Sequence, residues 1–495
     1  MSIGQNLYKL VQYYDMAFKQ ETYIKLQRDK ILQRLSKFKK LYLEFGGKLF
    51  DDYHMSRCVP GFQPDVKIKM LLTMREKCEI IISINAEDIE RGKVRPDSGL
   101  TYENEALRLV QNFASVGLKV NSIVIIKYNH QPAAKIYAAK LERMGLKVHL
   151  FQAIPGYPTD VNLVVSDRGY GANPFIQTTK PIVVVTGPGA GSGKLSVALS
   201  QLYHELKNGK KAGFAKFETL PVWNFRLKHP LNMAYEAATV NINDINMIDI
   251  YHFEKYGEAA VNYNRDIEAF PLLRNILNRM YKKPIYHSPT DMGVNMVGFC
   301  IEDEAAVERA CRQEIIRRYF QTLCDFKLGI VSEDAVNRIK MICEEMDIKL
   351  SERPVVDAAL EVQYQTGKPS AAIQLKDGRV IAASENGYTS AGSELVLKAL
   401  QTIMDTDDKI IPDNVMQKTK ELKDNLFSDG KFLISIGELL LILSSSSIDC
   451  ELCSRALAAL PKLQGAEIHT TNMLREEEQR VLRRLKINLT QEPIY

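Results

Sequence analysis

The stretch Pro181–Ser196, PIVVVTGPGAGSGKLS, decides how this chain folds. Its β-branched run Ile182–Val185 predicts a buried strand, and the run SVALSQLYHELK after Lys194 predicts a helix. Glycines alternate with small residues between the two. A strand, a glycine loop and a helix in this order can bind phosphate, because bare backbone N–H groups and the helix N-terminus both attract anions. The residues expected to cradle it are Gly187, Gly189, Gly191, Ser192, Gly193, Lys194 and Ser196.

The spacing within this loop departs from the Walker A pattern. That motif has four residues between its first glycine and the Gly-Lys pair, and a Ser or Thr directly after the lysine. Here five residues separate Gly187 from Gly193, and Leu195 stands where the hydroxyl is expected. A Mg²⁺-binding hydroxyl would come from one of three residues: Ser192, Ser196 or Thr186. Two interpretations stay open: a P-loop-like phosphate site, which the lysine and helix favour, and a glycine turn that only packs a strand against a helix.

Composition and charge limit the classes of protein that need to be considered. At 495 residues the chain has room for about three domains. Its 45% hydrophobic and 25% charged residues are ordinary for a soluble globular protein. The net charge of +5 gives no reason to expect nucleic acid as a partner. The longest apolar run falls well short of the ~20 residues of a membrane span, so we expect no membrane partner.

Cysteine usage and the N-terminal sequence predict a cytoplasmic protein. Most of the eight cysteines stand alone, and the first residues do not read as a signal peptide. Residues 1–45 are expected to be helical, with apolar positions that recur at helical spacing through the basic stretch KLQRDKILQRLSKFKKLYLEF. These positions are Ile24, Leu26, Ile31, Leu32, Leu35, Phe38 and Leu41.

From Glu79 onward, apolar runs alternate with helical patterns. Continuous apolar strands separated by helices predict a mainly parallel sheet covered on both faces. Ligands bind such sheets at the carboxyl ends of the strands, which is where the glycine loop falls. The predicted strands are EIIISIN, VNSIVIIKY, KVHLFQAI, VNLVVSD, the run that ends at Thr186, and AGFAKF.

The chain divides into three predicted parts. Residues 1–300 form an α/β phosphate- or nucleotide-binding-like domain with N-terminal helices, and within it residues 220–300 read as a long irregular segment or lid. Residues 301–350 form a helical section. Residues 351–495 form a smaller α/β domain, in which SAAIQLKDGRVIAAS is a hairpin turned at Asp377-Gly378.

Several acidic residues are candidates to act with the loop. Asp167 ends the predicted strand VNLVVSD and is placed like a Walker B aspartate that holds Mg²⁺ together with Ser196. Asp160, at the other end of that run, is a second candidate. The alternative is that Asp167 only begins a turn before the glycines that follow it.

Two loops gather candidate substrate-binding residues. In HSPTDMGVNM, Asp291 and Asn295 are four residues apart and would share one face of a helix capped by Ser288 or Thr290. In FGGKLFDDYHMSRCVPGF, Arg57 suits an anionic group and His54 can transfer a proton near neutral pH. In each loop the alternative is a structural role, as a cap or a connection.

Cys450 and Cys453 form the C-x-x-C pair of this chain. Zinc would need two further ligands, and His469 is the only histidine nearby in the sequence. A redox pair is an alternative, but two buried cysteines on one helix are the interpretation we favour.

The motifs TGPGAGSGKLS, KFET, SPTDMGVNM, FGGKLFDDYHMSR and PGYPTDVNLVVSD together resemble one bacterial family, over nearly the whole chain. That family is defined only as a domain of unknown function, so the resemblance implies an architecture rather than a reaction. It implies a C-terminal domain similar in topology to cytidine deaminases. The zinc ligand that those enzymes place two residues before the catalytic Glu is missing in Ala391-Gly392-Ser393-Glu394, which makes zinc an unexpected cofactor.

We therefore expect an enzyme that binds ATP or another nucleotide with Mg²⁺ and transfers a phosphoryl or nucleotidyl group to a small molecule. Lys194, Asp167 and Asp291 are the predicted catalytic residues, and His54, Arg57 and Asn295 would bind the substrate. One alternative is a non-catalytic protein that holds a phosphorylated metabolite. A weaker one is nucleoside or purine chemistry in the C-terminal domain. A homo-oligomer stays open.

Overall fold

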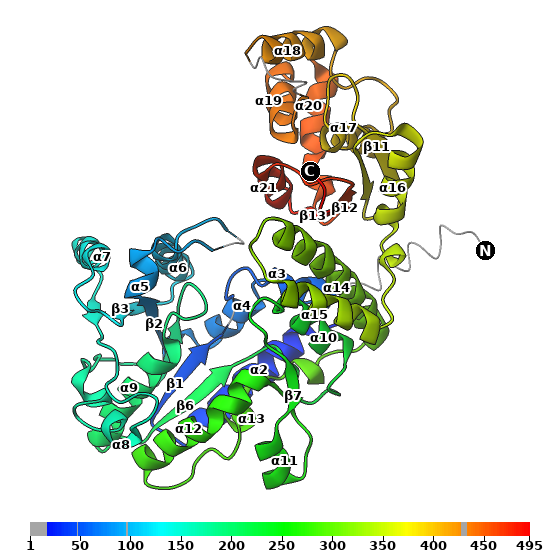
Figure 1. The fold of residues 1–495 in the computed structure, drawn as a ribbon. Coiled ribbons are helices and arrows are strands. Elements are labelled where there is room, and N and C mark those ends of the chain that lie inside the picture. The colour runs from blue at the N-terminus through cyan, green and yellow to red at the C-terminus, as the bar shows by residue number, and fades with distance from the viewer. Residues whose placement is uncertain (1–16, 47, 96–97, 427–432) are drawn as a thin grey trace. The chain divides into compact units, whose positions relative to one another are not determined.

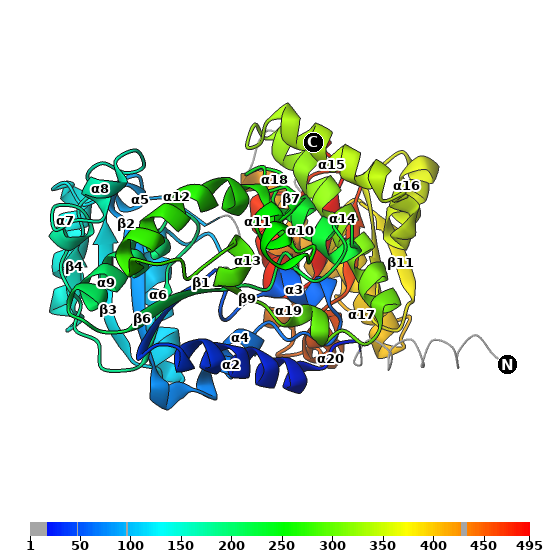
Figure 2. The same ribbon diagram turned by 90° about the horizontal axis from the view of Figure 1, so that it is seen from below.

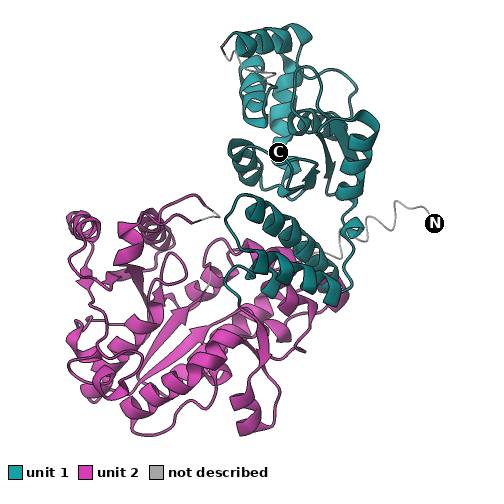
Figure 3. Cartoon of the chain, viewed as in Figure 1, with its two compact units in different colours: residues 1–15, 236–243, 308–495 teal, residues 16–235, 244–307 magenta. Residues whose placement is uncertain are grey.

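The structure, a computed structural model, describes residues 17–46, 48–95, 98–426 and 433–495. Among these, residues 17–235 and 244–307 form one compact unit, and residues 236–243 and 308–495 form another (Figure 3). We describe each unit by itself and call them the sheet unit and the C-terminal unit. No helix in the described part of the chain has the length and apolar content that a bilayer crossing requires.

The described residues of the sheet unit contain a seven-stranded sheet in the order β4-β3-β2-β5-β1-β6-β9 (Figure 1). Each neighbouring pair in it is parallel. All carboxyl ends therefore lie at one edge. The strands are β1 (Lys40–Phe45), β2 (Cys78–Asn85), β3 (Val120–Ile126), β4 (Val148–Leu150), β5 (Ile182–Thr186), β6 (Ala212–Phe217) and β9 (Gly293–Val294).

Strand β5 lies in the middle of the sheet, between β2 and β1. Val185 pairs with Ile81 on one side and with Glu44 on the other. All five residues of β5 are buried, which explains their β-branched, apolar character. The glycine loop that leaves β5 is therefore flanked by the ends of two other strands.

Helices cover both faces of the sheet (Figure 2). On one face, α9 (Lys194–Lys207) and α12 (Asn264–Tyr281) pack on Tyr42, Val183 and Val185. On the other lie α2 (Gln20–Ser36), α4 (Val66–Leu72) and α6 (Tyr102–Ser115). Further helices are α3 (Tyr53–Cys58), α5 (Ala86–Glu90), α7 (Pro132–Arg143), α8 (Val161–Val164), α10 (Pro230–Ala238), α11 (Ile250–Tyr256) and α13 (Pro289–Met292).

The predicted helix over residues 1–45 is wrong in its last part. Helix α2 ends at Ser36, and KLYLEF forms strand β1; residues 1–16 lie outside the described residues. Every residue of β1 except Glu44 is buried, because the strand pairs with β5 on one side and β6 on the other. Strands β5 and β6 lie more than a hundred positions later in the chain, and backbone pairing with them overrides the local helical pattern.

The predicted strand VNLVVSD is also wrong. Val161–Val164 form the short helix α8, which Asp160 caps by accepting a hydrogen bond from Leu163 N at 3.0 Å. The Ser166 hydroxyl then closes a turn by donating to the Leu163 carbonyl at 2.6 Å. Local capping by Asp and Ser side chains competes with a strand in this way.

Residues 220–300, predicted to be irregular, contain regular elements that belong to the sheet unit. Besides the helices above, β7 (Asn246–Ile248) and β8 (Val261–Tyr263) form a two-stranded antiparallel sheet. Helix α12 continues directly from β8 and packs on the main sheet. Residues 220–235 and 244–300 are therefore a structured part of the sheet unit rather than a lid.

The C-terminal unit carries a smaller mixed sheet in the order β11-β10-β12-β13, so the predicted fold class, a mainly parallel α/β domain with a smaller C-terminal α/β domain, is confirmed. Strand β10 is antiparallel to β11 and β12, and β12 is parallel to β13. The predicted hairpin is β10–β11, and helix α17 follows it. The strands are β10 (Ser370–Gln374), β11 (Val380–Ser384), β12 (Glu467–Thr470) and β13 (Asn488–Gln491).

Helices surround this mixed sheet and precede it along the chain. The section predicted to be helical, residues 301–350, contains α14 and α15. The helices are α14 (Glu304–Lys327), α15 (Glu333–Glu345), α16 (Pro354–Thr366), α17 (Ala391–Met404), α18 (Asp413–Leu426), α19 (Ile436–Ser446), α20 (Glu451–Ala459) and α21 (Glu476–Arg484).

A buried arginine joins the start of α16 to this sheet. The Arg353 side chain is 1% exposed and donates to Glu467 Oε2 at 2.5 Å, to Thr490 Oγ1 at 3.1 Å and to the Asn488 carbonyl at 3.1 Å. One guanidinium thereby holds together β12, β13 and the segment before α16. Such a group stabilises the fold only while all its partners remain in place.

We predict that Arg353→Met lowers the free energy of unfolding of the C-terminal unit by about 3–5 kcal/mol, because Glu467 loses its most buried partner. Arg379→Met is the matched control. It removes an ion pair to Asp377 in which both side chains are about half exposed (52% and 50%). That change should shift stability by no more than ~1 kcal/mol in urea unfolding followed by circular dichroism. Equal losses in the two variants would contradict the prediction.

Candidate functional site

The glycine loop connects β5 to α9, and three of its glycines leave little room for a Cβ; on Gly187 a Cβ would lie 2.4 Å from the Ser83 backbone oxygen. Gly193 has a φ of +82°, and a Cβ there would lie 2.1 Å from Ile126 Cδ1. A Cβ on Gly189 would lie 2.4 Å from the Tyr102 hydroxyl oxygen. The loop is thus packed closely between β3 and the start of α6, and side chains other than hydrogen would displace it.

Two side chains of the loop turn back onto its own backbone. Ser192 is fully buried, and its hydroxyl donates to the Gly189 carbonyl at 2.9 Å. The Lys194 ammonium donates to the same carbonyl at 3.2 Å and lies 3.5 Å from Ser192 Oγ. The loop is therefore closed on itself here, and an anion would have to compete with these contacts.

Lys194 lies among other charged groups at the carboxyl edge of the sheet. Burial lowers the pKa of Lys194; Glu44 opposes this shift, while Lys216 and Arg265 add to it. Glu44 lies on β1, the strand next to β5, and burial raises the pKa of its carboxyl. Its Oε2 atom is buried without a hydrogen-bond partner in the described part of the chain. A buried oxygen without a partner is unusual and calls for an explanation, of which a bound ion is one.

Lys216, at the end of β6, is shared by two carboxylates. It forms ion pairs with Asp266 at the start of α12 and with Glu218, the latter at 3.2 Å. Burial opposes the positive charge of Lys216, but these carboxylates outweigh it and hold its pKa well above the usual range. One ammonium cannot neutralise two buried acids, so burial and Asp266 raise the pKa of Glu218 to about 7.

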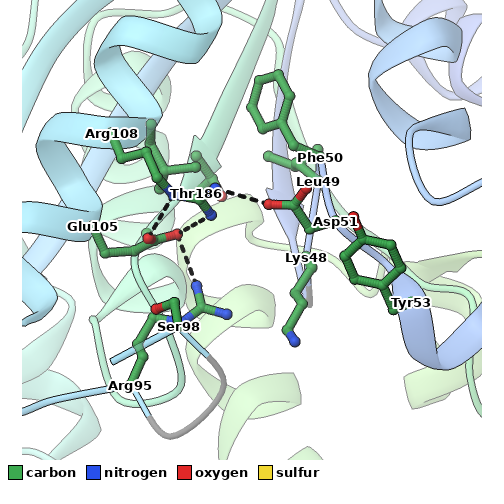
Figure 4. Close-up of a pocket in the computed structure, with 12 residues that line it drawn as sticks. Lys48, Leu49, Phe50, Asp51, Tyr53, Arg95, Ser98, Glu105, Arg108 and Thr186 are labelled. Carbon is green, nitrogen blue, oxygen red and sulfur yellow. Dashed lines mark hydrogen bonds and ion pairs between the residues drawn. The ribbon is translucent and has the colours of Figure 1, made fainter. Parts of the chain in front are cut away.

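A pocket of about 270 Å³ opens beside the loop, at the ends of β1 and β5 (Figure 4). Thr186 and Gly187 belong to both the pocket and the loop region, whereas Lys194 does not line the pocket. The lining combines three basic residues, two carboxylates and apolar side chains: Lys48, Leu49, Phe50, Asp51, Tyr53, Arg95, Ser98, Glu105, Arg108, Leu109, Thr186 and Gly187.

A buried carboxylate organises the basic side of this pocket. Glu105 is 1% exposed and accepts hydrogen bonds from Arg95 and Arg108, each at 2.9 Å (Figure 4). Arg108 also bonds Asp51 at 2.9 Å, and Arg95 donates to the Pro188 carbonyl at 2.9 Å. Arg95 therefore connects the pocket directly to the glycine loop.

Asp167 lies away from the loop, contrary to our prediction. Its carboxylate accepts from Tyr203 at 2.9 Å and pairs with Lys207 at the last position of α9. The thirteen residues from Lys194 to Lys207 span ~20 Å at 1.5 Å per helical residue, so Asp167 and Ser196 cannot hold one Mg²⁺ ion. Asp160 and Asp167 instead line a separate depression around α8.

Asp291 and Asn295 do not share a helix face. Ser288 caps α13 as expected, but that helix ends at Met292 and the chain continues as strand β9. Asn295 is 5% exposed and its amide donates to the Pro221 carbonyl at 2.9 Å, which is a structural role. Asp291 accepts from the Tyr256 hydroxyl at 2.8 Å and from His287 N at 2.9 Å.

The remaining predicted residues of the sheet unit do not line the pocket. His54 and Arg57 are on α3 beside Tyr53, but only Tyr53 lines the pocket. Ser196 is in the first turn of α9 and partly buried. In the C-terminal unit, Glu394 accepts hydrogen bonds from Asn386 at 2.7 Å and Thr389 at 2.9 Å.

Sequence reasoning missed Glu44 and Arg108 as members of the site, and it weighed Arg95, with Arg91 and Lys93, as more often part of a structural connection. Glu44 was missed because KLYLEF was read as helix; its six-residue run followed by Gly46 was the available signal. Lys216 and Glu218 lie in the KFET motif at the end of a correctly predicted strand. Their position at the sheet edge could therefore be predicted, but their ion pairing could not. Arg108 pairs locally with Glu105 on α6, but no local pattern indicates that it meets Asp51 or that Arg95 meets the Pro188 carbonyl.

The fold and the site together define a parallel α/β protein with a charged, glycine-containing carboxyl edge. Residues 16–347 match the family described as "Domain of unknown function DUF1846, N-terminal", and residues 351–495 match its C-terminal counterpart. The chain belongs to this family.

Full-length relatives support the same assignment. A UPF0371 protein of Streptococcus pyogenes serotype M3 is 44% identical over 483 residues, which is 97% of this chain and 98% of the relative. A UPF0371 protein of Clostridium botulinum is 45% identical over 491 residues, with the same coverage of both chains. The family resemblance inferred from the motifs is thereby confirmed. It brings no specific activity with it.

We predict that Glu218 makes the protein less stable as the pH rises from about 4.5 to about 7. The pKa of Glu218 is about 7 in the folded protein and about 4.5 in the unfolded chain. Its contribution to the free energy of unfolding is therefore fully present below about pH 4.5 and is lost as the pH rises through about 7. Glu218→Gln stays neutral and should remove this part of the slope. Urea unfolding at about pH 5 and about pH 7.5 measures it.

The exposed Glu76→Gln controls for the loss of one carboxylate, because its side chain is 84% exposed. It should leave the difference in unfolding midpoint between the two pH values as in the natural sequence. A Glu218→Gln variant with an unchanged pH dependence would show that Glu218 is ionised throughout this range.

Proposed function

We propose that this protein is a cytoplasmic enzyme that binds a nucleotide, ATP being the first candidate, and transfers a phosphoryl or nucleotidyl group to a small anionic molecule. The observation that supports the proposal most is the presence of an ammonium group and a carboxylate beside the loop. Lys194 begins α9, and Glu44 offers an unpartnered carboxylate oxygen from the neighbouring strand. Parallel sheets bind ligands at this edge.

The phosphates would meet the loop and the start of α9. This helix has 14 residues, and its N-terminal N–H groups favour negative charge. The Lys194 ammonium now contacts two neutral oxygen atoms, those of Gly189 and Ser192. Charge-assisted hydrogen bonds are about twice as strong as neutral ones. A phosphate would therefore draw Lys194 out of its present contacts and open the loop.

Glu44 fits the role that we first predicted for Asp167, the carboxylate that holds Mg²⁺. Such ions usually keep several waters and bind one or two carboxylates together with substrate phosphates, so no complete protein cage is required. Among the described residues no group of three or more His, Cys, Asp or Glu is arranged to hold a metal, in keeping with that mode. Bound there, Mg²⁺ would neutralise charge on the phosphates.

The acceptor would occupy the pocket beside Gly187. Lys48, Arg95 and Arg108 bring positive charge to a volume of about 270 Å³, which suits a small carboxylate or phosphate compound rather than a polymer. Glu105 and Asp51 hold Arg108 in place, so its fork is oriented before any ligand enters. Orientation of this kind lowers the entropic penalty of binding.

One observation favours a second candidate, a non-catalytic protein that holds a phosphorylated metabolite. The loop is closed by Ser192 and Lys194, and the first hydroxyl of α9, Ser196, stands one residue beyond its Walker A position. A site without a well-placed Mg²⁺ hydroxyl can bind phosphate without transferring it. If ATP bound to the protein survives long incubation with Mg²⁺ and a panel of small carboxylates, this second candidate is favoured.

We predict that Lys194→Ala weakens ATP binding at least about tenfold in titration calorimetry with Mg²⁺, because a hydrogen bond from a charged donor contributes about 1.5–3 kcal/mol. Lys207→Ala, at the other end of the same helix, is the matched control and should leave the Kd unchanged. A Kd unaffected by Lys194→Ala would refute nucleotide binding at the loop.

We predict that Glu44→Gln abolishes the strengthening of ATP binding by Mg²⁺ while leaving the binding of ATP alone unchanged or tighter. The amide has the size of the carboxylate but carries no charge for the ion, and it no longer repels phosphate. Titrations with and without Mg²⁺ separate the two effects. A Mg²⁺ dependence that persists in Glu44→Gln would place the ion elsewhere.

A further inference from the structure

Cys450 and Cys453 lie at the start of α20 in an asymmetric arrangement that differs from the two buried helical cysteines we favoured. Cys450 is the N-cap residue, outside the helix and partly exposed, whereas Cys453 is fully buried. The Cys450 sulfur accepts a hydrogen bond from Cys453 N at 3.3 Å. The i, i+3 spacing at a helix start is that of disulfide-exchanging C-x-x-C motifs.

The two sulfur atoms face the same backbone carbonyl. Both thiols reach one acceptor, the Ile410 carbonyl oxygen, at 3.8 Å from Cys450 and 3.0 Å from Cys453. The two sulfurs therefore lie on the same side of the helix start, as a disulfide between them requires.

The pair combines an activated thiol with a protected one. Hydrogen bonds from Cys453 and from backbone N–H groups of α20 lower the pKa of Cys450. Burial and the hydrogen bond to Cys450 raise the pKa of Cys453 to about 12. The thiolate is the nucleophile in disulfide exchange, so Cys450 is set up to react first.

No other cysteine of the chain has this combination. All eight are described and are free thiols, and every one except Cys450 is buried. Burial raises the pKa of Cys78 to about 12 and that of Cys343 to about 11. The exposed, activated thiol and its buried neighbour thus stand apart from the structural cysteines.

We propose that Cys450 and Cys453 form a redox-active dithiol, oxidised to an intramolecular disulfide by low-molecular-weight disulfides. The Cys450 thiolate attacks one sulfur of the external disulfide, forms a mixed disulfide and releases one thiolate. The Cys453 thiol loses its proton and attacks Cys450 Sγ, which releases the second external thiol. The external disulfide gains two electrons and two protons and becomes two thiols, and the cysteine pair loses the same.

Oxidation would also release a contact within the C-terminal unit. Cys453 now donates to the Ile410 carbonyl, in the segment that links α17 to α18. A disulfide has no thiol proton to donate, so this hydrogen bond disappears on oxidation. The linking segment before α18 should then exchange its amide protons faster.

The test incubates the full chain with oxidised glutathione, blocks remaining thiols with an alkylating reagent, and maps the disulfides by peptide mass spectrometry. We expect a single Cys450–Cys453 bond that a dithiol reductant reverses, with the six other cysteines alkylated only after unfolding. In the reduced protein, Cys450 should be alkylated at least about tenfold faster than Cys343. Hydrogen exchange of the linker before α18 gives a second readout.

Two variants separate the roles. Cys453→Ala should trap a stable mixed disulfide on Cys450, because the resolving thiol is gone. Cys450→Ser keeps an N-cap side chain and should leave Cys453 unmodified in the folded protein. Thermal unfolding confirms that each variant is folded.

The proposal is overturned if the natural sequence retains both thiols under conditions that fully oxidise a reference C-x-x-C protein. It is equally overturned if glutathione stays on Cys450 of the natural sequence without being displaced by Cys453. Neither outcome depends on nucleotide binding by the sheet unit.

Discussion

The site depends on the insertion of β5 between β2 and β1. A strand that pairs in parallel on both sides must bury both faces and project its carboxyl end between those of its neighbours. Val185 pairs with Ile81 and with Glu44, so the loop after Thr186 begins between two other strand ends. This single placement puts Lys194 near Glu44 and opens the pocket at Gly187. Without it the loop would be an ordinary turn.

Electrostatics then give the edge its chemical character. Lys194 is partly buried among charges of both signs, and Lys216 serves two carboxylates at once. Desolvated charges of this kind are a poor way to stabilise a fold, since burying each ion carries a penalty that its partners only partly offset. Perturbed acids and bases gathered at a ligand-binding edge are typical of functional sites instead.

The two units use buried charge differently. In the C-terminal unit, Arg353 finds an acceptor for nearly every N–H it presents, and Glu467 is held by Arg353 and Arg317. That network is satisfied and reads as structural. At the carboxyl edge of the sheet unit, one Glu44 oxygen has no partner among the described residues. The Arg353 network is complete and the one around Glu44 is not, and a buried polar atom without a partner calls for an explanation.

Features that arise from neighbours in the chain were predictable from the sequence. The strand, glycine loop and helix of Pro181–Ser196 follow from burial, backbone freedom and helix propensity within sixteen residues, and the hairpin at Gly378 is equally local. Helix capping could be predicted only in part. Ser288 was predicted as a cap and is one, whereas Asp160 caps α8 in a segment that was predicted to be a strand.

The identity of the site was decided by tertiary structure. Glu44 lies near Lys194 because β1 pairs with a strand about 140 positions later in the chain, and Arg108 and Arg95 contact Asp51 and the Pro188 carbonyl only when α6 packs over that edge. Asp167, closer to Lys194 in sequence, is carried to the far end of α9. Sequence proximity and composition determine which elements form, because their causes are local. Which side chains meet depends on strand order, since pairing between distant segments sets the distances over which charges act.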